Sequence, residues 1–101
     1  MTKRIYIAGP MTGHLNFNYA AFNAEAARLR ALSYDVENPA ENAEPPCKSW
    51  QGYMRTALAQ MLTCDIVALL PGWSKSKGAM IEYRLACDLG LTTVSADEVV
   101  A

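Results

Sequence analysis

Glu82 is the acidic residue whose neighbours in the sequence most favour chemistry. Small and apolar residues recur around it at three- and four-residue spacing, so a single carboxylate lies on an otherwise apolar helix face. The residues of this face are Gly78, Ala79, Glu82, Leu85, Ala86 and Leu89. We expect Glu82 in the first helical turn, as a carboxylate that takes part in ligand chemistry. The alternative is that it stabilises its own helix end as a cap or salt-bridge partner.

A buried strand is predicted directly before this helix. Residues 64–70 form a short, mostly apolar run that Pro71-Gly72 ends, and a polar loop then leads into the helix. Continuous apolar runs of this length are typical of strands buried on both faces of a parallel sheet. Open α/β sheets bind ligands beyond the carboxyl ends of such strands, which is where the pattern places Glu82.

A second candidate ligand loop follows the first predicted strand, which begins at Arg4 and ends at Gly9-Pro10. Gly9 and Gly13 bracket a turn that also contains Pro10, Met11 and Thr12. Glycines let backbone N–H groups approach an anion, although this spacing is neither a dinucleotide fingerprint nor a Walker loop. The loop therefore predicts either a ligand contact or a plain turn.

The remaining pattern predicts alternating strands and helices. Helices are expected at residues 16–32, with Asn16 or Asn18 as the cap, at residues 50–62 after a Ser49 cap, and at about residues 78–89. Strands are expected at residues 4–8, 34–38, 65–70 and 91–95. This order predicts a single-domain three-layer α/β protein, with a Rossmann/flavodoxin-like fold whose parallel sheet of about four strands has helices on both faces.

Two features of these elements also bear on a site. Residues 40–48, rich in Pro and Glu, predict an irregular loop that either lines the site or is only a solvated connector. The helix after Ser49 carries Trp50, Tyr53, Met54, Ala57, Leu58, Met61 and Leu62 at helical spacing. We interpret this stripe as a core-facing surface. Because it exceeds what a small monomer needs, it predicts a homodimer or a larger symmetric assembly.

The charge and the apolar content of the chain limit the classes of ligand and the cellular locations that we expect. The formal net charge is -1, so no basic surface favours a nucleic acid polymer or an anionic membrane, and small molecules or proteins are the expected ligands. No apolar run approaches a membrane span, and the apolar segment after Arg4 is too short for a signal peptide. A cytoplasmic location is therefore expected.

Neither a disulfide framework nor a metal site is expected. The cysteines Cys47, Cys64 and Cys87 are odd in number and far apart, which favours reduced and mostly buried thiols. His14 is the sole histidine, and no cysteine pair has ligand spacing.

Several of these segments together resemble the nucleoside 2-deoxyribosyltransferase-like superfamily, and within it a small DUF4406-like branch of phage and prophage proteins of unknown function. The similar segments are residues 5–13, Cys64-Asp65, residues 70–73, residues 76–82 and Leu85-Ala86. They span nearly the whole chain. The resemblance implies an enzyme of N-glycosidic bonds in the cytoplasm of a bacterium or an infected host, with no cofactor and a nucleoside or nucleotide as substrate.

The resemblance also implies roles for particular residues. Glu82 matches a glutamate that attacks the anomeric carbon of deoxyribose and forms a covalent glycosyl-enzyme, which a second base or water resolves. Tyr6 matches a tyrosine that positions this carboxylate. Ser76 matches a serine that binds a 5'-phosphate, and the segment with Gly78 and Ala79 would contribute helix N–H groups. The loop of residues 9–13 would complete the substrate site.

The chain also departs from these relatives. Ala57 stands where they carry an aspartate that protonates the leaving base, and Asp65 is interpreted as structural rather than as its replacement. Pro10 and Thr12 stand where the phosphohydrolase branch has a phosphate-binding Ser and Arg. Relatives complete the site with a neighbouring subunit's C-terminal segment, so here the site is either open or closed by residues 38–50.

Three functions remain compatible with these residues. The first is transfer or hydrolysis at the N-glycosidic bond of 2'-deoxynucleosides or their 5'-monophosphates. The second is a non-catalytic nucleotide-binding module, and the third is a phage interaction protein on the same fold. Tyr6, Ser76 and Glu82 together favour the enzyme, whereas Ala57 favours the other two.

Overall fold

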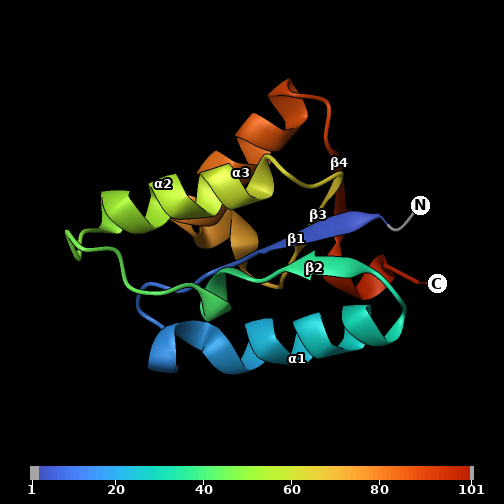
Figure 1. Cartoon of the computed structure of the whole chain (residues 1–101), viewed down its shortest axis with the longest axis horizontal. Helices are drawn as coiled ribbons and strands as arrows, with labels where there is room; N and C mark the ends of the chain where they lie inside the picture. Colours follow the sequence, from blue (N-terminus) through green and yellow to red (C-terminus); the bar gives the residue numbers. More distant parts are fainter. Residues whose placement is uncertain (1–2, 101) are drawn as a thin grey trace.

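The computed structural model describes residues 3–100 and shows a parallel sheet between two layers of helices (Figure 1). The strands are β1 (Arg4–Ala8), β2 (Asp35–Glu37), β3 (Ile66–Leu69) and β4 (Thr92–Ser95), and the helices are α1 (Tyr19–Ala31), α2 (Trp50–Met61) and α3 (Lys77–Asp88). In space the four strands run in the order β2-β1-β3-β4, and every pairing is parallel. The predicted three-layer Rossmann-like α/β fold is confirmed.

The strand order creates one position suited to a ligand. The chain passes from β1 outward to β2, then returns across β1 to form β3 on its other side. The connection after β1 therefore runs toward β2, and the connection after β3 runs the other way, toward β4, so the two diverge between β1 and β3. A crevice opens at this point, outside the carboxyl ends of the strands. The loop after β1 and the loop between β3 and α3 both begin there.

Alternation along β1 assigns its side chains to two cores. Ile5 and Ile7 pack with Phe22 and Leu29 of α1 on one face of the sheet. On the other face the core contains Tyr6, Ala8, Ala57, Met61, Val67 and Ala86, together with other residues of β3, α2 and α3. Because successive side chains of a strand point to opposite faces, Tyr6 lies on the face that α3 covers. This places the Tyr6 hydroxyl within reach of Glu82.

The first helix begins later than predicted. Residues Leu15–Asn18 form a separate 3₁₀ turn, and α1 starts at Tyr19. Asn18 occupies the cap position, but its side-chain amide donates to the Pro10 carbonyl at 3.1 Å and not to the helix. The expectation of an Asn side-chain cap was therefore wrong, because a tertiary contact takes the side chain.

The segment after β2 is also more regular than predicted. Pro39–Glu41 form a 3₁₀ turn, and the Asn38 side chain caps it by accepting a hydrogen bond from the Ala40 N–H at 3.1 Å. Asn38 is almost fully buried, and its amide also donates to Asn23 of α1 at 3.0 Å. The Asn-Pro pair thus starts a capped turn instead of an irregular loop.

The apolar stripe on α2 is only partly buried. Ser49 caps the helix as predicted, since its Oγ accepts a hydrogen bond from the Gly52 N–H at 3.0 Å. Ala57 and Met61 are buried, but Leu62 remains 52% exposed. Leu89, which follows the last residue of α3, is also 55% exposed, so it does not lie on the buried face on which the spacing placed it.

Two of the three cysteines are exposed, against expectation. Cys64 is buried, whereas Cys47 and Cys87 reach the surface. Within residues 3–100, no helix combines the length and apolar character that crossing a membrane requires.

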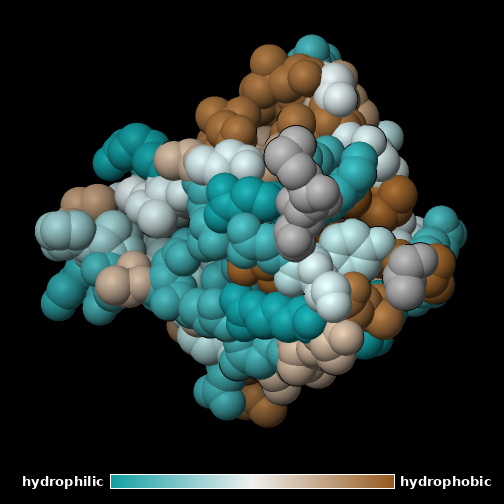
Figure 2. All heavy atoms as spheres, turned by 45° about the vertical axis from the view of Figure 1, so that its right-hand side comes forward, coloured by the Kyte–Doolittle hydropathy of each residue, from teal (hydrophilic) through white to brown (hydrophobic). Residues whose placement is uncertain are grey.

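We expect the protein to form a homodimer or a larger symmetric assembly. Leu62, Ile81 and Leu89 are exposed on the helices of one face, and Figure 2 shows hydrophobic side chains gathered over the end of the molecule to which α3 rises. Covering such surface in a second copy removes apolar area from water. Light scattering at micromolar concentration measures the mass directly, and a monomeric mass would refute this expectation.

Candidate active site

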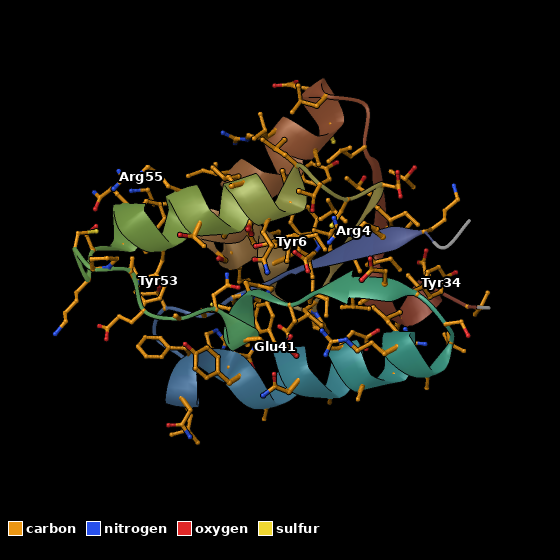
Figure 3. The ribbon with its side chains drawn as sticks, viewed as in Figure 1. Arg4, Tyr6, Tyr34, Glu41, Tyr53 and Arg55 are labelled. Carbon is orange, nitrogen blue, oxygen red and sulfur yellow. The ribbon has the colours of Figure 1, made fainter. Side chains whose placement is uncertain are left out.

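Tyr6 and Glu82 form a buried pair between the sheet and α3. The Tyr6 hydroxyl donates a hydrogen bond to Glu82 Oε2, across 76 residues of sequence. Tyr6 is 1% exposed and Glu82 is 5% exposed. Figure 3 shows Tyr6 near the centre of the molecule, above β1 on the side of α2 and α3. The structure thus brings together the two residues that the sequence proposed as catalytic.

Burial decides the protonation of this pair. Loss of water raises the pKa of Glu82 to about 7, although the hydrogen bond from Tyr6 acts in the opposite direction. Burial and the nearby carboxylate raise the pKa of Tyr6 well above its ordinary value, so Tyr6 remains a proton donor. Near neutral pH, Glu82 therefore exists in both its neutral and its ionised form.

The sequence predicted Glu82 in the first turn of α3, but the structure places it later in the helix. The helix starts at Lys77 because Ser76 caps it, with Oγ accepting from the Ala79 N–H at 3.2 Å. Glu82 is then the sixth helical residue, beyond the turn in which the helix dipole acts on a charge. The dipole consequently does little to offset the cost of burying this carboxylate.

The second oxygen of Glu82 is available to a ligand. Oε2 is held by Tyr6, and no side chain of residues 3–100 donates to Oε1. In the same residues, no buried side-chain oxygen or nitrogen lacks a partner, so Oε1 is not sealed from solvent. Glu82 lines a cavity, and Oε1 is the oxygen that has no protein donor there. The geometry is that of a carboxylate oriented through one oxygen and presented through the other.

The cavity has a volume of about 1070 Å³ and lies at the carboxyl ends of the strands. Nine predicted site residues line it: Tyr6, Gly9, Pro10, Met11, Thr12, Ser76, Gly78, Ala79 and Glu82. The tenth, Gly13, does not line the cavity; it is exposed, and its φ of +85° belongs to the turn of the loop. The segment between β2 and α2 lines the cavity as well, through Pro39, Asn42, Glu44 and Lys48.

Two glycines of the site have packing roles. A Cβ atom on Gly9 would lie 2.8 Å from the Leu70 Cβ, so glycine lets the loop after β1 pass close to the end of β3. A Cβ on Gly78 would lie 3.1 Å from the Met54 sulfur, so glycine brings α3 close to α2. Both residues shape the cavity wall through close backbone approach, whatever the ligand.

Ala57 lies at the cavity, whereas Asp65 lies far from it. Ala57 lines the cavity from α2, and its methyl group has no proton to transfer. Asp65 lies at the opposite, amino-terminal end of the strands, where its Oδ2 accepts a hydrogen bond from the Arg4 N–H at 3.1 Å. The structural role predicted for Asp65 is confirmed.

Sequence reasoning missed the aromatic part of the cavity. Phe17 lines it from the segment before α1, Tyr19 from the start of α1, and Trp50 and Tyr53 from α2. Trp50 and Tyr53 had been interpreted as core residues because of their helical spacing, and nothing in the sequence around Phe17 indicates its position. Lys77 also lies over the Trp50 ring, with Nζ 4.6 Å from the ring centroid.

Fold and site together define a single-domain parallel α/β protein with a buried acid in a large cavity at the switch point of its sheet. The chain belongs to the family of the domain of unknown function DUF4406, whose model matches residues 3–95. No curated protein and no solved structure matches the chain.

Replacing Tyr6 with Phe should raise the pKa of Glu82 further. The substitution keeps the ring but removes the hydrogen bond that favours the ionised carboxylate, and a hydrogen bond to a charge corresponds to about one pH unit. The ¹³C chemical shift of the Glu82 carboxyl group, followed against pH, measures this directly. Tyr34→Phe is a matched control, because the Tyr34 hydroxyl bonds the Val100 carbonyl instead. An unchanged Glu82 titration in Tyr6→Phe would contradict the assigned pair.

Proposed function

We propose that this chain is an enzyme of the nucleoside 2-deoxyribosyltransferase-like superfamily that acts on the N-glycosidic bond of 2'-deoxynucleosides or their 5'-monophosphates. The observation that carries the proposal is the buried Glu82 carboxylate: Tyr6 holds it at Oε2, Oε1 has no protein donor, and Glu82 lines a cavity that residues of the predicted substrate loop also line. We place the enzyme in the cytoplasm of a bacterium or a phage-infected cell.

The proposed reaction has two displacements. Glu82 Oε1 attacks C1' of the deoxyribose and forms an ester bond while the C1'–N bond breaks. The electron pair of that bond leaves with the base, which takes up a proton from water. A water molecule or a second base then attacks C1', releases the sugar and restores the carboxylate. Tyr6 keeps Glu82 oriented in both steps, because its hydroxyl remains a donor over the whole physiological pH range.

Loop geometry supports a place for the sugar and its 5' substituent beside Glu82. Pro10, Met11 and Thr12 line the same cavity as Ser76, Gly78 and Ala79. Ser76 Oγ already accepts the Ala79 N–H, so it retains its own hydroxyl proton to donate to a phosphate oxygen. A 5'-phosphate here would also lie at the N-terminus of α3, where anions are favoured.

Ala57 favours a second candidate, a nucleotide-binding module without catalysis. Relatives would need an acid at this position to protonate the base, and a methyl group faces the cavity instead. Such a module would bind the same ligands through the same walls and would release no base. Interaction with another protein on this scaffold is the third candidate, and it does not require the cavity.

Incubation with a panel of deoxynucleosides and deoxynucleoside 5'-monophosphates tests the proposal. We expect free base, detected by chromatography, at a rate that increases with pH through about 7 as Glu82 ionises. Ligand binding without base release would instead support the binding module. Failure to bind any member of the panel would leave only the interaction protein.

A further inference from the structure

The outer part of the cavity has aromatic side chains on two opposing sides. Phe17 and Tyr19 approach it from the 3₁₀ turn and the start of α1, with ring centroids 5.9 Å apart. Trp50 and Tyr53 line it from the first turn of α2. In Figure 3, Tyr53 projects from α2 toward the start of α1, whereas Arg55 projects from the opposite side of the helix. Flat aromatic ligands stack favourably on such rings.

The backbone holds Phe17 in this position at the expense of local preference. Asn16, Phe17 and Asn18 have φ values of 48°, 53° and 62°, in the left-handed region that residues with a side chain rarely adopt in succession. Hydrogen bonds from the Phe17 N–H to the His14 carbonyl, and from the Asn18 amide to the Pro10 carbonyl, maintain the turn. Phe17 is nevertheless 57% exposed, so core packing does not explain this geometry.

Glu44 adds a hydrogen-bond acceptor to the same part of the cavity. It lines the cavity from the segment between β2 and α2, and in the described residues it forms no ion pair. Glu44 is exposed and lines the cavity together with Tyr53. Desolvation, then the charge of Glu44 and then Tyr19 raise the pKa of the Tyr53 hydroxyl. An ionised carboxylate only accepts hydrogen bonds, and it accepts two at once from adjacent donors.

We propose that the outer cavity is the base subsite and that it selects guanine: the base stacks on Phe17, and Glu44 accepts hydrogen bonds from its N1–H and 2-amino groups. This proposal rests on the proposed function, because it places the deoxyribose at Glu82 and the base outward from it. Among the common bases only guanine presents two adjacent donors. The N3–H of thymine lies between two carbonyl oxygens, and the amino groups of adenine and cytosine lie beside a ring acceptor, which a carboxylate repels.

The test compares ligands that differ in one amino group. We would measure binding of 2'-deoxyguanosine and 2'-deoxyinosine, and of their 5'-monophosphates, by calorimetry with Glu82→Gln, which cannot form the covalent intermediate. The guanine ligands should bind about fivefold to tenfold more tightly than their hypoxanthine partners, which lack only the 2-amino group. Glu44→Gln in the same background should abolish this difference, because the amide offers one acceptor and one donor.

Phe17→Ala and Leu15→Ala form a matched pair for the stacking contact. Both residues are exposed apolar side chains of the same turn, at 57% and 89%, but only Phe17 lines the cavity. Phe17→Ala should weaken the binding of both purine nucleosides about tenfold. The ratio of their two affinities should not change, since stacking does not depend on the amino group. Leu15→Ala should change neither.

Several outcomes would overturn the base subsite. These are equal binding of the guanine and hypoxanthine ligands, an undiminished preference in Glu44→Gln, or equal effects of the two alanine variants. Because binding is measured without turnover, a wild-type protein that binds guanine nucleosides selectively but releases no base would refute the proposed reaction alone. Absence of binding to every ligand would refute the subsite.

Discussion

Glu82→Gln should abolish base release while making the protein more stable at neutral and alkaline pH. Gln keeps the shape of the side chain and can accept the Tyr6 hydrogen bond, but its amide oxygen is a poor nucleophile. Loss of the nucleophile should lower the rate roughly 10⁴-fold or more. No deoxyribosyl adduct should be detected by mass spectrometry after incubation with substrate.

The stability gain follows from the raised pKa of Glu82. Between pH 4.5 and about 7, the folded protein binds the Glu82 proton more tightly than the unfolded chain does. The stability of the wild type therefore falls as the pH rises through that window. Above pH 7 the accumulated cost is about 3 kcal/mol, and Gln does not incur it. The melting temperatures of the two proteins should therefore be similar near pH 4.5 and diverge as the pH increases.

Asp88→Asn provides the matched control on the same helix. Asp88 is exposed in the last turn of α3, so the substitution removes one negative charge without touching the cavity. It should retain full base release, and at pH 7 its melting temperature should differ from the wild-type value much less than that of Glu82→Gln does, since a charge in the last helical turn corresponds to about 0.3–1 kcal/mol. If Glu82→Gln were instead less stable than the wild type at pH 8 and still released base, Glu82 would be a structural group and the case for an enzyme would fail.

Ala57→Asp should accelerate the release of unactivated bases. Ala57 lines the cavity from α2, and the proposed superfamily carries an acid at the matching position, so an aspartic acid there is expected to protonate the departing base. General acid assistance typically contributes about 10²–10⁴-fold. A nitro-aromatic leaving group needs no proton, so its release should change little. The ratio of the two rates, measured by chromatography and by absorbance, isolates the proton-transfer contribution.

Ala59→Asp is the control for this substitution. Ala59 is exposed on the same helix and does not line the cavity. The substitution Ala59→Asp therefore introduces the same charge at a position that substrate does not reach. Ala57 is only 8% exposed, and a thermal melt is needed to show that Ala57→Asp remains folded. A folded Ala57→Asp whose two rates are equal to or below the wild-type rates would show that protonation is not what Ala57 lacks, and the assigned leaving-group position would be wrong.

Sequence alone determined the fold and the edge of the sheet that carries the site. Helix starts at Ser49 and Ser76 follow from local capping chemistry, and the buried strands follow from short apolar runs bounded by Gly and Pro. These signals depend on residues a few positions apart, so they can be recognised in the sequence without a structure. Alternating strands and helices then require a parallel sheet, and its carboxyl edge is the general location of ligands.

Only the tertiary structure decided the chemistry available at that edge. The Tyr6–Glu82 hydrogen bond joins residues that are 76 positions apart, and the pKa of Glu82 depends on how completely the sheet and helices exclude water from it. The left-handed turn that presents Phe17 depends on the contact between Asn18 and Pro10. Desolvation and contacts between distant segments are properties of the packed chain, so no local pattern in the sequence contains them.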